Sequence, residues 1–582
     1  MIILGFNHGH DGGSTLVIDG EIVASISEER LNRIKKNIDV YLDFPPIQSM
    51  LYCVEAANIS LKDVDLFVFN QTEHKRLWSM GDGLHYVIEF LNYTYGISKD
   101  KFEYISHHDA HIYSSFLTST FDESCVIVAD GAGEDVRIDE DGEPPGLGFE
   151  YLTARGYDLV DTEDDNTVYT EGWTVANVDY AGIEDIEKKW IEFRKEPAFE
   201  GLKETSIGGI YDIAAWQLVS NFKSWPSAGK VMGLASYADK EWVNRQELPY
   251  KIEDDNLTIQ SEPVYPEVTE NSTFQEKANV AGIYQKSQED SIMYLAEKSK
   301  KGSNSKNLCV TGGSFLNCNT NYNILTSGLY ENVHLFPALD DSGISVGAAL
   351  YGALKYDKII HKDFFNPYLG RTYSDSEILK AANKEAAVFV TKYESEKKLI
   401  EKTVELLSND KVIGWFQGGS EIGPRALGNR SILASPMSDG MRAHINSNVK
   451  LREWYRPFAP AVLYEKQKEI FDFDYFSPYM LVTAEVKEEW RSRIPSVTHH
   501  DNTARYQSVT PETNSKFYNL IKEFDKKTGV PVLLNTSFNG PTEPIVETPE
   551  DAIRSFLELE IDYLVIGNFL IQKRFQKRFQ KR

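Results

Sequence analysis

The sequence predicts an α/β protein of more than one domain. Strand-like runs of aliphatic and β-branched residues alternate with helical patterns along the chain. Three of these runs end in glycine-bearing turns, which expose backbone N–H groups to a ligand. The 582 residues exceed what one hydrophobic core supports, so two large domains or three smaller ones are expected.

The chain opens with an antiparallel meander of three strands, predicted at residues 2–6, 14–18 and 21–27. An Asp-Gly dipeptide between the last two favours a tight hairpin turn. The first turn, residues 7–13, is polar and free to bind a ligand. In it Asp11 would orient His10 as a general base for a substrate hydroxyl, with His8 as the competing candidate. The simpler interpretation is that His10 is an ordinary polar residue of the turn without a catalytic role.

Helical patterns at residues 46–58 and 84–95 precede a histidine-rich segment. If residues 107–116 are helical, His107 and His111 lie on one face and can bind one divalent metal. Asp130, at the end of an apolar strand, would supply an oxygen ligand. Such a histidine pair also arises by chance in a chain with 12 histidines, and a buried histidine commonly only completes a hydrogen bond.

The middle of the chain changes in composition. An acidic segment with scattered aromatic residues, about 134–204, is interpreted as an insertion that either caps a site or forms a solvated surface excursion. Helical sequence containing Lys230 follows. A strand at residues 308–311 then leads to Gly312 and Gly313, and Asp340 and Asp341 follow before a helix rich in small residues.

A stretch without a clear period at residues 355–376 predicts a domain boundary, which gives domains 1–360 and 361–582. The second domain has helical patterns and strands of its own, so it is also predicted to be α/β. Helices are expected at residues 376–387 and 395–408, and strands at 412–416, 530–534 and 563–566.

The second domain contains a local reversal of charge. From residue 425 to 456 there are six basic residues and two acidic ones, although the whole chain has a formal net charge of -27. Arginine suits phosphate and carboxylate oxygens, so an anionic substrate is predicted, and a solvated surface is the alternative. Arg505 adds a further cation, and Asn535 and Ser537 end a buried strand with groups that would bind a small amide.

The overall charge disfavours a nucleic-acid partner, which normally needs a basic face. The four cysteines form no CxxC pair, which favours a reducing cytoplasm. No run of 18 apolar residues and no leader with a cleavage site are present, so no membrane partner is expected.

Eight segments together resemble the O-carbamoyltransferases of natural-product and nodulation-factor biosynthesis, in the family's order and across residues 1–570. They are residues 10–14 (HDGGS), 107–111 (HHDAH), 130–134 (DGAGE), 229–235 (GKVMGLA), 312–319 (GGSFLNCN), 423–431 (GPRALGNRS), 449–460 (VKLREWYRPFAP) and 535–539 (NTSFN). The resemblance implies a two-lobed actin-like, or sugar-kinase-like, ATPase domain followed by a YrdC-like α/β domain.

The resemblance also implies roles for individual residues. Fe(II) or another divalent metal is expected at His107, His111, Asp130 and Asp341, with Mg(II) as a further candidate cofactor. Catalytic roles fall to His10, Lys450 and Arg505. Carbamoyl phosphate is expected at Arg425, Arg430, Lys450, Arg456, Arg505, Asn535 and Ser537. ATP is expected at Gly12, Gly131, Gly133, Lys230, Gly312, Gly313 and Asn317.

The implied mechanism has two stages. The second domain converts carbamoyl phosphate and ATP to carbamoyl-adenylate. The first domain then transfers the carbamoyl group to the hydroxyl of a small molecule. Because the chain is acidic, this acceptor is expected to be a cation. A homodimer is a candidate assembly. A tRNA threonylcarbamoyl transferase is the alternative, which the charge disfavours. A metallopeptidase is disfavoured, because the histidine pair of this chain lacks the glutamate of HExxH. A non-catalytic scaffold would require that the arginines bind no anion.

The resemblance leaves two positions open. An extra histidine in the first turn keeps both His8 and His10 as candidates for the base, and Asp340 beside Asp341 leaves the fourth metal ligand ambiguous by one position.

Overall fold

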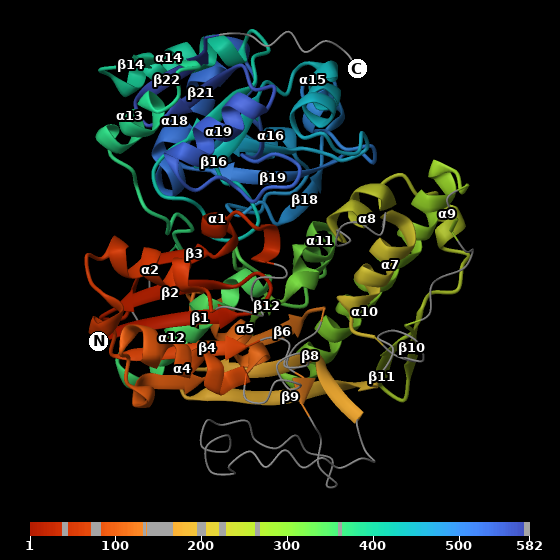
Figure 1. Ribbon diagram of the computed structural model, residues 1–582. Coiled ribbons are helices and arrows are strands. Elements are labelled where there is room, and N and C mark those ends of the chain that lie inside the picture. The colour runs from red at the N-terminus through yellow and green to blue at the C-terminus, as the bar shows by residue number, and fades with distance from the viewer. Residues whose placement is uncertain are drawn as a thin grey trace. The chain divides into compact units, whose positions relative to one another are not determined.

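The computed structural model describes residues 1–37, 45–71, 83–131, 135–136, 167–194, 205–219, 228–261, 268–269, 271–358 and 364–574. The chain divides into two compact units. The first comprises Met1–Asn32 and Lys36–Phe365, and the second comprises Arg33–Lys35 and Asn366–Arg582. Both units mix helices with sheets, which confirms the predicted α/β class (Figure 1).

The first sheet of the first unit has the strand order β3-β2-β1-β4-β5. The first three strands form the predicted antiparallel meander, and β4 and β5 continue the sheet parallel to β1. Phe6 of β1 stacks on Phe69 of β4 in the core beneath, with ring centroids 5.2 Å apart. The strands are β1 (Ile2–His8), β2 (Gly13–Ile18), β3 (Glu21–Ser27), β4 (Leu66–Gln71) and β5 (Phe102–Tyr104).

The second sheet repeats this arrangement. β6, β8 and β9 are antiparallel neighbours, and β12 and β13 continue the sheet in parallel on the other side of β6. Two sheets of the same order are the two lobes of an actin-like fold. The strands are β6 (Glu123–Ala129), β7 (Asp135–Val136), β8 (Thr167–Asp179), β9 (Gly182–Arg194), β12 (Asn307–Thr311) and β13 (Asn332–Leu335), with β10 (Tyr250–Glu253) and β11 (Asn256–Ile259) as a separate hairpin.

One sequence interpretation needs correction here. The acidic segment at residues 134–204 is not wholly an insertion, because β8 pairs with β6 along its length and so belongs to the sheet of the second lobe. Trp173 and Val175 of β8 are fully buried, whereas within residues 167–194 the charged residues lie mainly on the outer strand β9.

Helices pack closely where the two sheets of the first unit meet. Gly347 of α12 lies against α5, and a Cβ at this position would be 1.8 Å from the carbonyl oxygen of Ala110, so only glycine fits. The helices are α1 (Glu29–Asn32), α2 (Ile47–Ala56), α4 (Gly83–Tyr95), α5 (His107–Phe116), α7 (Gly209–Val219), α8 (Ala228–Ala235), α9 (Lys240–Val243), α10 (Phe274–Gly302), α11 (Cys318–Thr326) and α12 (Ile344–Tyr356), with the short turns η1 (Lys35–Asn37), η2 (Leu61–Asp63), η3 (Lys99–Lys101), η4 (Gly313–Leu316) and η5 (Asp341–Gly343).

The second unit contains one mixed sheet of nine strands, ordered β14-β22-β21-β15-β16-β20-β17-β19-β18. Its strands are β14 (Val388–Lys392), β15 (Ile413–Phe416), β16 (Arg430–Ala434), β17 (Ala459–Leu463), β18 (Val482–Glu485), β19 (Thr503–Val509), β20 (Val532–Ser537), β21 (Tyr563–Ile566) and β22 (Phe569–Lys573). Its helices are α13 (Asp375–Asn383), α14 (Glu396–Leu407), α15 (Asp439–His444), η6 (Ile445–Val449), α16 (Tyr464–Ile470), α17 (Glu488–Arg491), η7 (Pro495–Val497), α18 (Pro511–Thr528) and α19 (Pro549–Glu558). The likeness of this unit to the YrdC fold stays a prediction.

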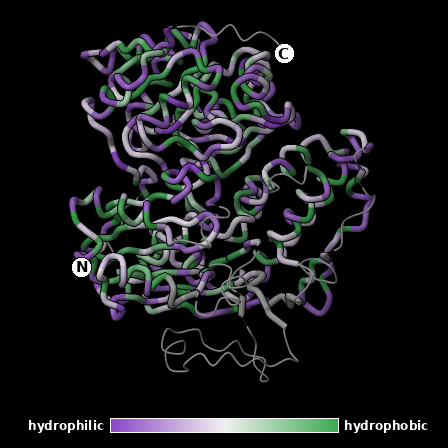
Figure 2. The backbone as a smooth tube through the Cα atoms, viewed as in Figure 1, coloured by the Kyte–Doolittle hydropathy of each residue, from purple (hydrophilic) through white to green (hydrophobic). Residues whose placement is uncertain are grey.

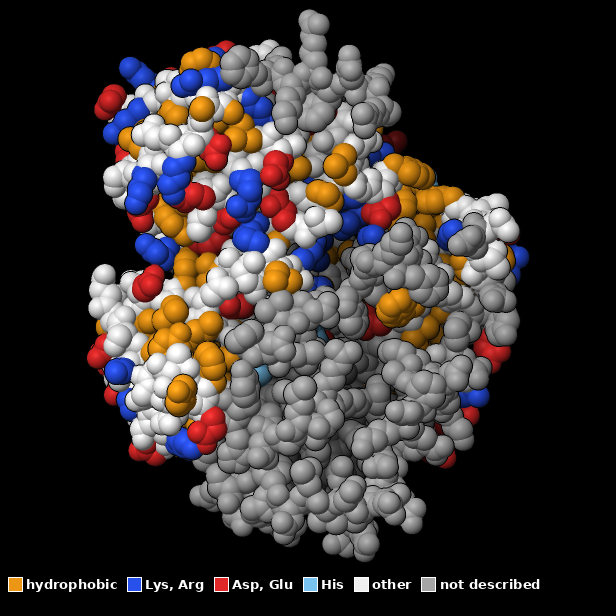
Figure 3. All heavy atoms as spheres, viewed as in Figure 1, with side chains coloured by type: hydrophobic (Ala, Val, Ile, Leu, Met, Phe, Trp, Pro, Cys, Tyr) orange, Lys and Arg blue, Asp and Glu red, His pale blue; other side chains and the backbone are white. Residues whose placement is uncertain are grey.

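Hydrophobic segments lie along the strands of both units, and hydrophilic segments are frequent in the outer turns (Figure 2). On the face in view in Figure 3, basic and acidic side chains are interspersed over the second unit. Among the described residues, no helix combines the length and the apolar character needed to span a bilayer. All four cysteines are buried and unpaired.

Candidate active site

Two histidines and two aspartates form a compact buried cluster in the first unit. The hydroxyl of Ser106 accepts a backbone N–H of the first turn of α5, so the helix begins at His107 and places His111 one turn further on the same face. Asp130 follows β6, and Asp341 begins η5. One ligand atom from each of these four residues lies within 4.8 Å of the others.

The cluster has the geometry of a cation site. The Nε2 atom of His107 lies 3.2 Å from Asp130 Oδ2, and that of His111 lies 3.5 Å from Asp341 Oδ1. Burial lowers the pKa of His111, but the two carboxylates outweigh it and raise the pKa to about 9. The buried Nε2 of His111 and Oδ2 of Asp341 make no hydrogen bond within the described chain. Two imidazoles and two carboxylates suit a divalent transition metal such as Fe(II).

The structure brings Asp341, and not Asp340, into this cluster. The Oδ1 atom of Asp340 accepts a hydrogen bond from the hydroxyl of Ser342 at 2.5 Å. Burial and the charge of Asp11 raise the pKa of Asp340 to about 6.

Substitution of a cluster histidine is expected to remove metal binding. His111→Ala deletes one of four ligands, so the affinity for added Fe(II) or Zn(II), measured by calorimetry under anaerobic conditions, should fall at least about 100-fold. His108→Ala is the matched control, because His108 lies on the same helix, is equally buried and contacts Thr174 instead. Equal metal binding by His111→Ala and wild type would contradict the assignment.

His10 lies beside the cluster. Its Nδ1 atom is 3.3 Å from Asp11 Oδ2, and its Nε2 atom is 3.6 Å from Asp341 Oδ2. Burial lowers the pKa of His10, but Asp341 and Asp11 outweigh it and raise the pKa to about 10. The positive charge of a bound metal would oppose this protonation. His8 ends strand β1 and is 2% exposed, so His10 is the histidine of the turn that borders the cluster.

Two residues of this site were missed by the sequence reasoning. Lys36 Nζ lies 3.5 Å from Asp11 Oδ2, and the Lys36 carbonyl accepts the Asp11 N–H at 2.9 Å. Asp212 of α7 lies near Gly131. The basic run at residues 33–36 in an acidic chain was the available signal for Lys36.

The residues predicted to bind ATP lie in different settings. Gly312 has a φ of 96°, and the Gly313 N–H donates to Asp130 Oδ1 at 3.0 Å, so this turn supports a cluster carboxylate. The Asn317 side chain is engaged by Tyr211, Gln285 and Gln288. The Gly12 N–H donates to the Gly9 carbonyl at 3.2 Å, Gly131 follows Asp130, and Lys230 lies on α8. Gly133 lies outside the described residues.

The second unit holds a buried lysine in a cage of oxygen atoms. Lys450 follows the π-helical turn η6, and the next residue, Leu451, has a φ of 45°. The Lys450 ammonium donates to the carbonyl and hydroxyl of Ser537 at 2.6 and 3.2 Å, and to the carbonyl and side-chain oxygens of Asn539 at 3.0 and 2.7 Å. All four oxygens are uncharged. Asn539 was not among the predicted site residues, although it lies in a quoted motif.

The cations around Lys450 act on its protonation. Burial and the charges of Arg452, Lys35 and Arg456 lower the pKa of Lys450 well below its usual range, against a smaller opposing effect of Glu543. An anion bound beside Lys450 would stabilise its protonated form.

Sulfate binding beside Lys450 is therefore expected to be coupled to proton uptake. A bound dianion favours the ammonium form of Lys450, so the affinity should fall as pH rises. Calorimetric titration in two buffers of different ionisation enthalpy measures the uptake, and Lys450→Met should remove the dependence on buffer. A wild-type binding enthalpy that is the same in both buffers would contradict the coupling.

Three arginines contribute to this cationic region. Burial and the charges of Arg456 and Arg505 lower the pKa of Arg452. Arg452 donates to Asn446 Oδ1 at 2.7 Å, and Arg456 lies 3.8 Å from the carboxylate of Glu453. Three guanidinium groups near one carboxylate favour an anionic ligand.

Other predicted residues of this region lie in buried or half-buried settings of the second unit. Arg430 is fully buried, donates to the carbonyls of Gln417, Gly418 and Asn429, and lies 3.6 Å above the ring of Phe416. The Asn535 side chain donates to the carbonyl of Ala426 and to Gln507, both at 3.0 Å. Arg425 is half-buried in the same loop. Glu421 organises the loop, because its Oε1 accepts the backbone N–H groups of Leu427, Asn429 and Arg430.

Comparisons with known proteins cover both units. Residues 2–80 and 84–350 match the family model described as the carbamoyltransferase N-terminus, and residues 404–573 match the carbamoyltransferase C-terminus. Nodulation protein NolNO of Sinorhizobium fredii is 30% identical over 97% of this chain and 79% of its own length. Protein sll1178 of Synechocystis is 31% identical over 99% of this chain and 97% of its own length. A solved structure of full-length HypF has a TM-score of 0.36 at 14% identity, covering 61% of this chain and 55% of HypF.

Proposed function

The chain belongs to the carbamoyltransferase family, and on that premise we propose that it is an ATP-dependent O-carbamoyltransferase that works in two stages. The observation that carries the proposal is the buried, caged Lys450 with its half-buried neighbouring arginines, a group of cations with too few carboxylates to balance it. Such a group suits a small phosphorylated substrate.

In the first stage the C-terminal unit binds carbamoyl phosphate and ATP. Water cleaves carbamoyl phosphate to carbamate and phosphate, and a carbamate oxygen then attacks the α-phosphorus of ATP, which releases pyrophosphate and leaves carbamoyl-adenylate. Free carbamate decomposes in water, so the site must exclude solvent during this step. Lys450 and Arg505 stabilise the phosphate oxygens, and Ser537 orients the Lys450 ammonium.

In the second stage the acceptor hydroxyl attacks the carbamoyl carbon, and AMP leaves. His10 takes the hydroxyl proton, while Asp11 holds the imidazole in place. A divalent metal at the His107 cluster, when bound, would hold phosphate oxygens and neutralise their charge. Asp11 and Asp341 lie against His10, and Asp11, Asp212 and Asp340 act on the neighbouring Lys36, so these acidic surroundings support a small alcohol carrying an amino or guanidino group as the acceptor.

Purified protein with carbamoyl phosphate and ATP tests this function. Pyrophosphate should be released in the absence of tRNA, and isotopically labelled carbamoyl phosphate added to cell extract should label a small alcohol detectable by mass spectrometry. Pyrophosphate release that occurs only with tRNA would favour the threonylcarbamoyl alternative, for which no comparison gives support. Release that is independent of carbamoyl phosphate would refute the proposal.

A further inference from the structure

A short piece of the N-terminal sequence belongs to the C-terminal compact unit. Arg33–Lys35 clusters with residues 366 onward, although the residues on both sides of it belong to the first unit. Arg33 has a φ of 64°, a left-handed conformation that is unfavourable for a non-glycine residue. Specific contacts must hold this strained residue in place.

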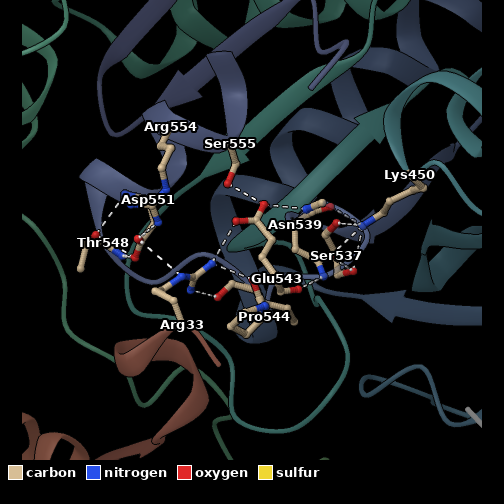
Figure 4. Close-up of polar contacts among 12 residues, drawn as sticks. Arg33, Lys450, Ser537, Asn539, Glu543, Pro544, Thr548, Asp551, Arg554 and Ser555 are labelled. Carbon is tan, nitrogen blue, oxygen red and sulfur yellow. Dashed lines mark hydrogen bonds and ion pairs between the residues drawn. The ribbon is translucent and has the colours of Figure 1, made fainter. Parts of the chain in front are cut away.

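The Arg33 guanidinium supplies those contacts (Figure 4). It donates to the carbonyls of Pro544 and Ile545, both at 2.8 Å. It also lies 3.4 Å from the carboxylate of Glu543 and 3.6 Å from that of Asp551. Glu543, Pro544 and Ile545 belong to the segment that joins β20 to α19, and Asp551 lies in the first turn of α19, all more than 500 residues away in sequence.

The same segment builds the cage around Lys450. The Glu543 carbonyl accepts the side-chain N–H of Asn539 at 2.7 Å, and the Glu543 carboxylate accepts the Gly540 N–H at 2.6 Å and the Ser555 hydroxyl at 2.7 Å. Asn539 in turn presents two oxygen atoms to the Lys450 ammonium. The contacts in Figure 4 thus run without interruption from Arg33 through Glu543 and Asn539 to Lys450.

Electrostatics gives an independent link. Lys35, two residues after Arg33, is among the charges that act on Lys450. This segment therefore adds positive charge to the anion pocket as well as hydrogen bonds to its supporting loop.

We propose that Arg33 is a positioning residue for the carbamoyl-phosphate pocket, where its guanidinium fixes the segment of residues 539–545 that aims the Lys450 ammonium. The inference rests on the proposed function for the identity of the ligand. It assigns a role in the C-terminal chemistry to a residue from the N-terminal part of the sequence.

Arg33→Ala in the full-length protein is expected to weaken carbamoyl phosphate binding about 10-fold or more, because it removes two hydrogen bonds and an ion pair from the segment of residues 543–545 and a second ion pair from the start of α19. Calorimetry measures the Kd directly. In the pyrophosphate assay the KM for carbamoyl phosphate should rise more than kcat falls. Arg33→Lys keeps the charge but cannot reach both carbonyls, so its Kd should lie between those of Arg33→Ala and wild type.

Arg493→Ala is the matched control, because Arg493 also belongs to the second unit and donates to a backbone carbonyl, that of Gly529 at 2.6 Å. Its Kd should equal that of wild type. A lowered Tm with an unchanged Kd in Arg33→Ala would overturn the inference, since the residue would then only stabilise the fold. Wild type that binds carbamoyl phosphate but releases no pyrophosphate would refute the proposed function, while the Kd values would still decide the role of Arg33.

Discussion

Replacing Lys450 with alanine is expected to abolish formation of carbamoyl-adenylate, lowering pyrophosphate release by about 10³-fold. The Lys450 ammonium is buried, and four uncharged oxygens of Ser537 and Asn539 hold it in one position. The group is therefore already in place when an anionic substrate binds and favours its ammonium form, and it needs no reorganisation as negative charge develops. The alanine variant leaves these oxygens with no donor and the neighbouring arginines without the central cation.

The measurement is pyrophosphate release with saturating carbamoyl phosphate and ATP, alongside thermal unfolding to exclude misfolding. Lys516→Ala is a matched control, because Lys516 is also a partly buried lysine of this unit and donates to Gln417 at 2.7 Å and to the Gly567 carbonyl at 3.0 Å. The control should lose stability but keep the reaction. Pyrophosphate release by Lys450→Ala within about 10-fold of wild type would exclude Lys450 from the chemistry.

His10→Ala should keep adenylate formation and lose carbamoyl transfer by about 10²- to 10⁴-fold, the contribution of a general base. The reason is position: His10 contacts Asp11 and Asp341 in the first unit, whereas the anion pocket of Lys450 lies in the second. Product formation from a labelled carbamoyl donor and pyrophosphate release are measured on the same sample.

His8→Asn separates the two candidate bases. His8 is buried at the end of β1, so its substitution should affect stability more than transfer. Loss of transfer in His8→Asn but not in His10→Ala would reverse the assignment. If His10→Ala and Lys450→Ala both stop pyrophosphate release, the two stages do not use separate groups.

Residues close in sequence or at strand ends were predictable. The spacing of His107 and His111 placed both on one helix face, and the position of Asp130 after an apolar strand placed it near them. The choice between Asp340 and Asp341 could not be made from sequence, because adjacent residues of a turn point in directions that only the fold determines. The structure selects Asp341 through its contacts with His107 and His111.

The misinterpretations have physical causes. Residues 167–194 were taken for part of an insertion because a long hairpin with a charged outer strand has the composition of a solvated segment. The role of Arg430 at a substrate stays a prediction; in the structure it is fully buried and its Nη1 donates to carbonyls of neighbouring turns, a setting that no local pattern encodes. The contacts of Arg33 join residues about 510 positions apart, and no local pattern in a single sequence encodes such a pairing.

The π-helical turn before Lys450 makes segment length a determinant of the chemistry. Residues Ile445–Val449 contain one residue more than an α-helical turn of the same span would need. Deleting any one of them would relax the turn to ordinary helix and swing the lysine by about 100° around the axis, away from its oxygen cage. The number of residues in this turn, more than the identity of any of its side chains, therefore decides where the Lys450 amine lies. Shortening this segment would be a poor way to make the protein more stable.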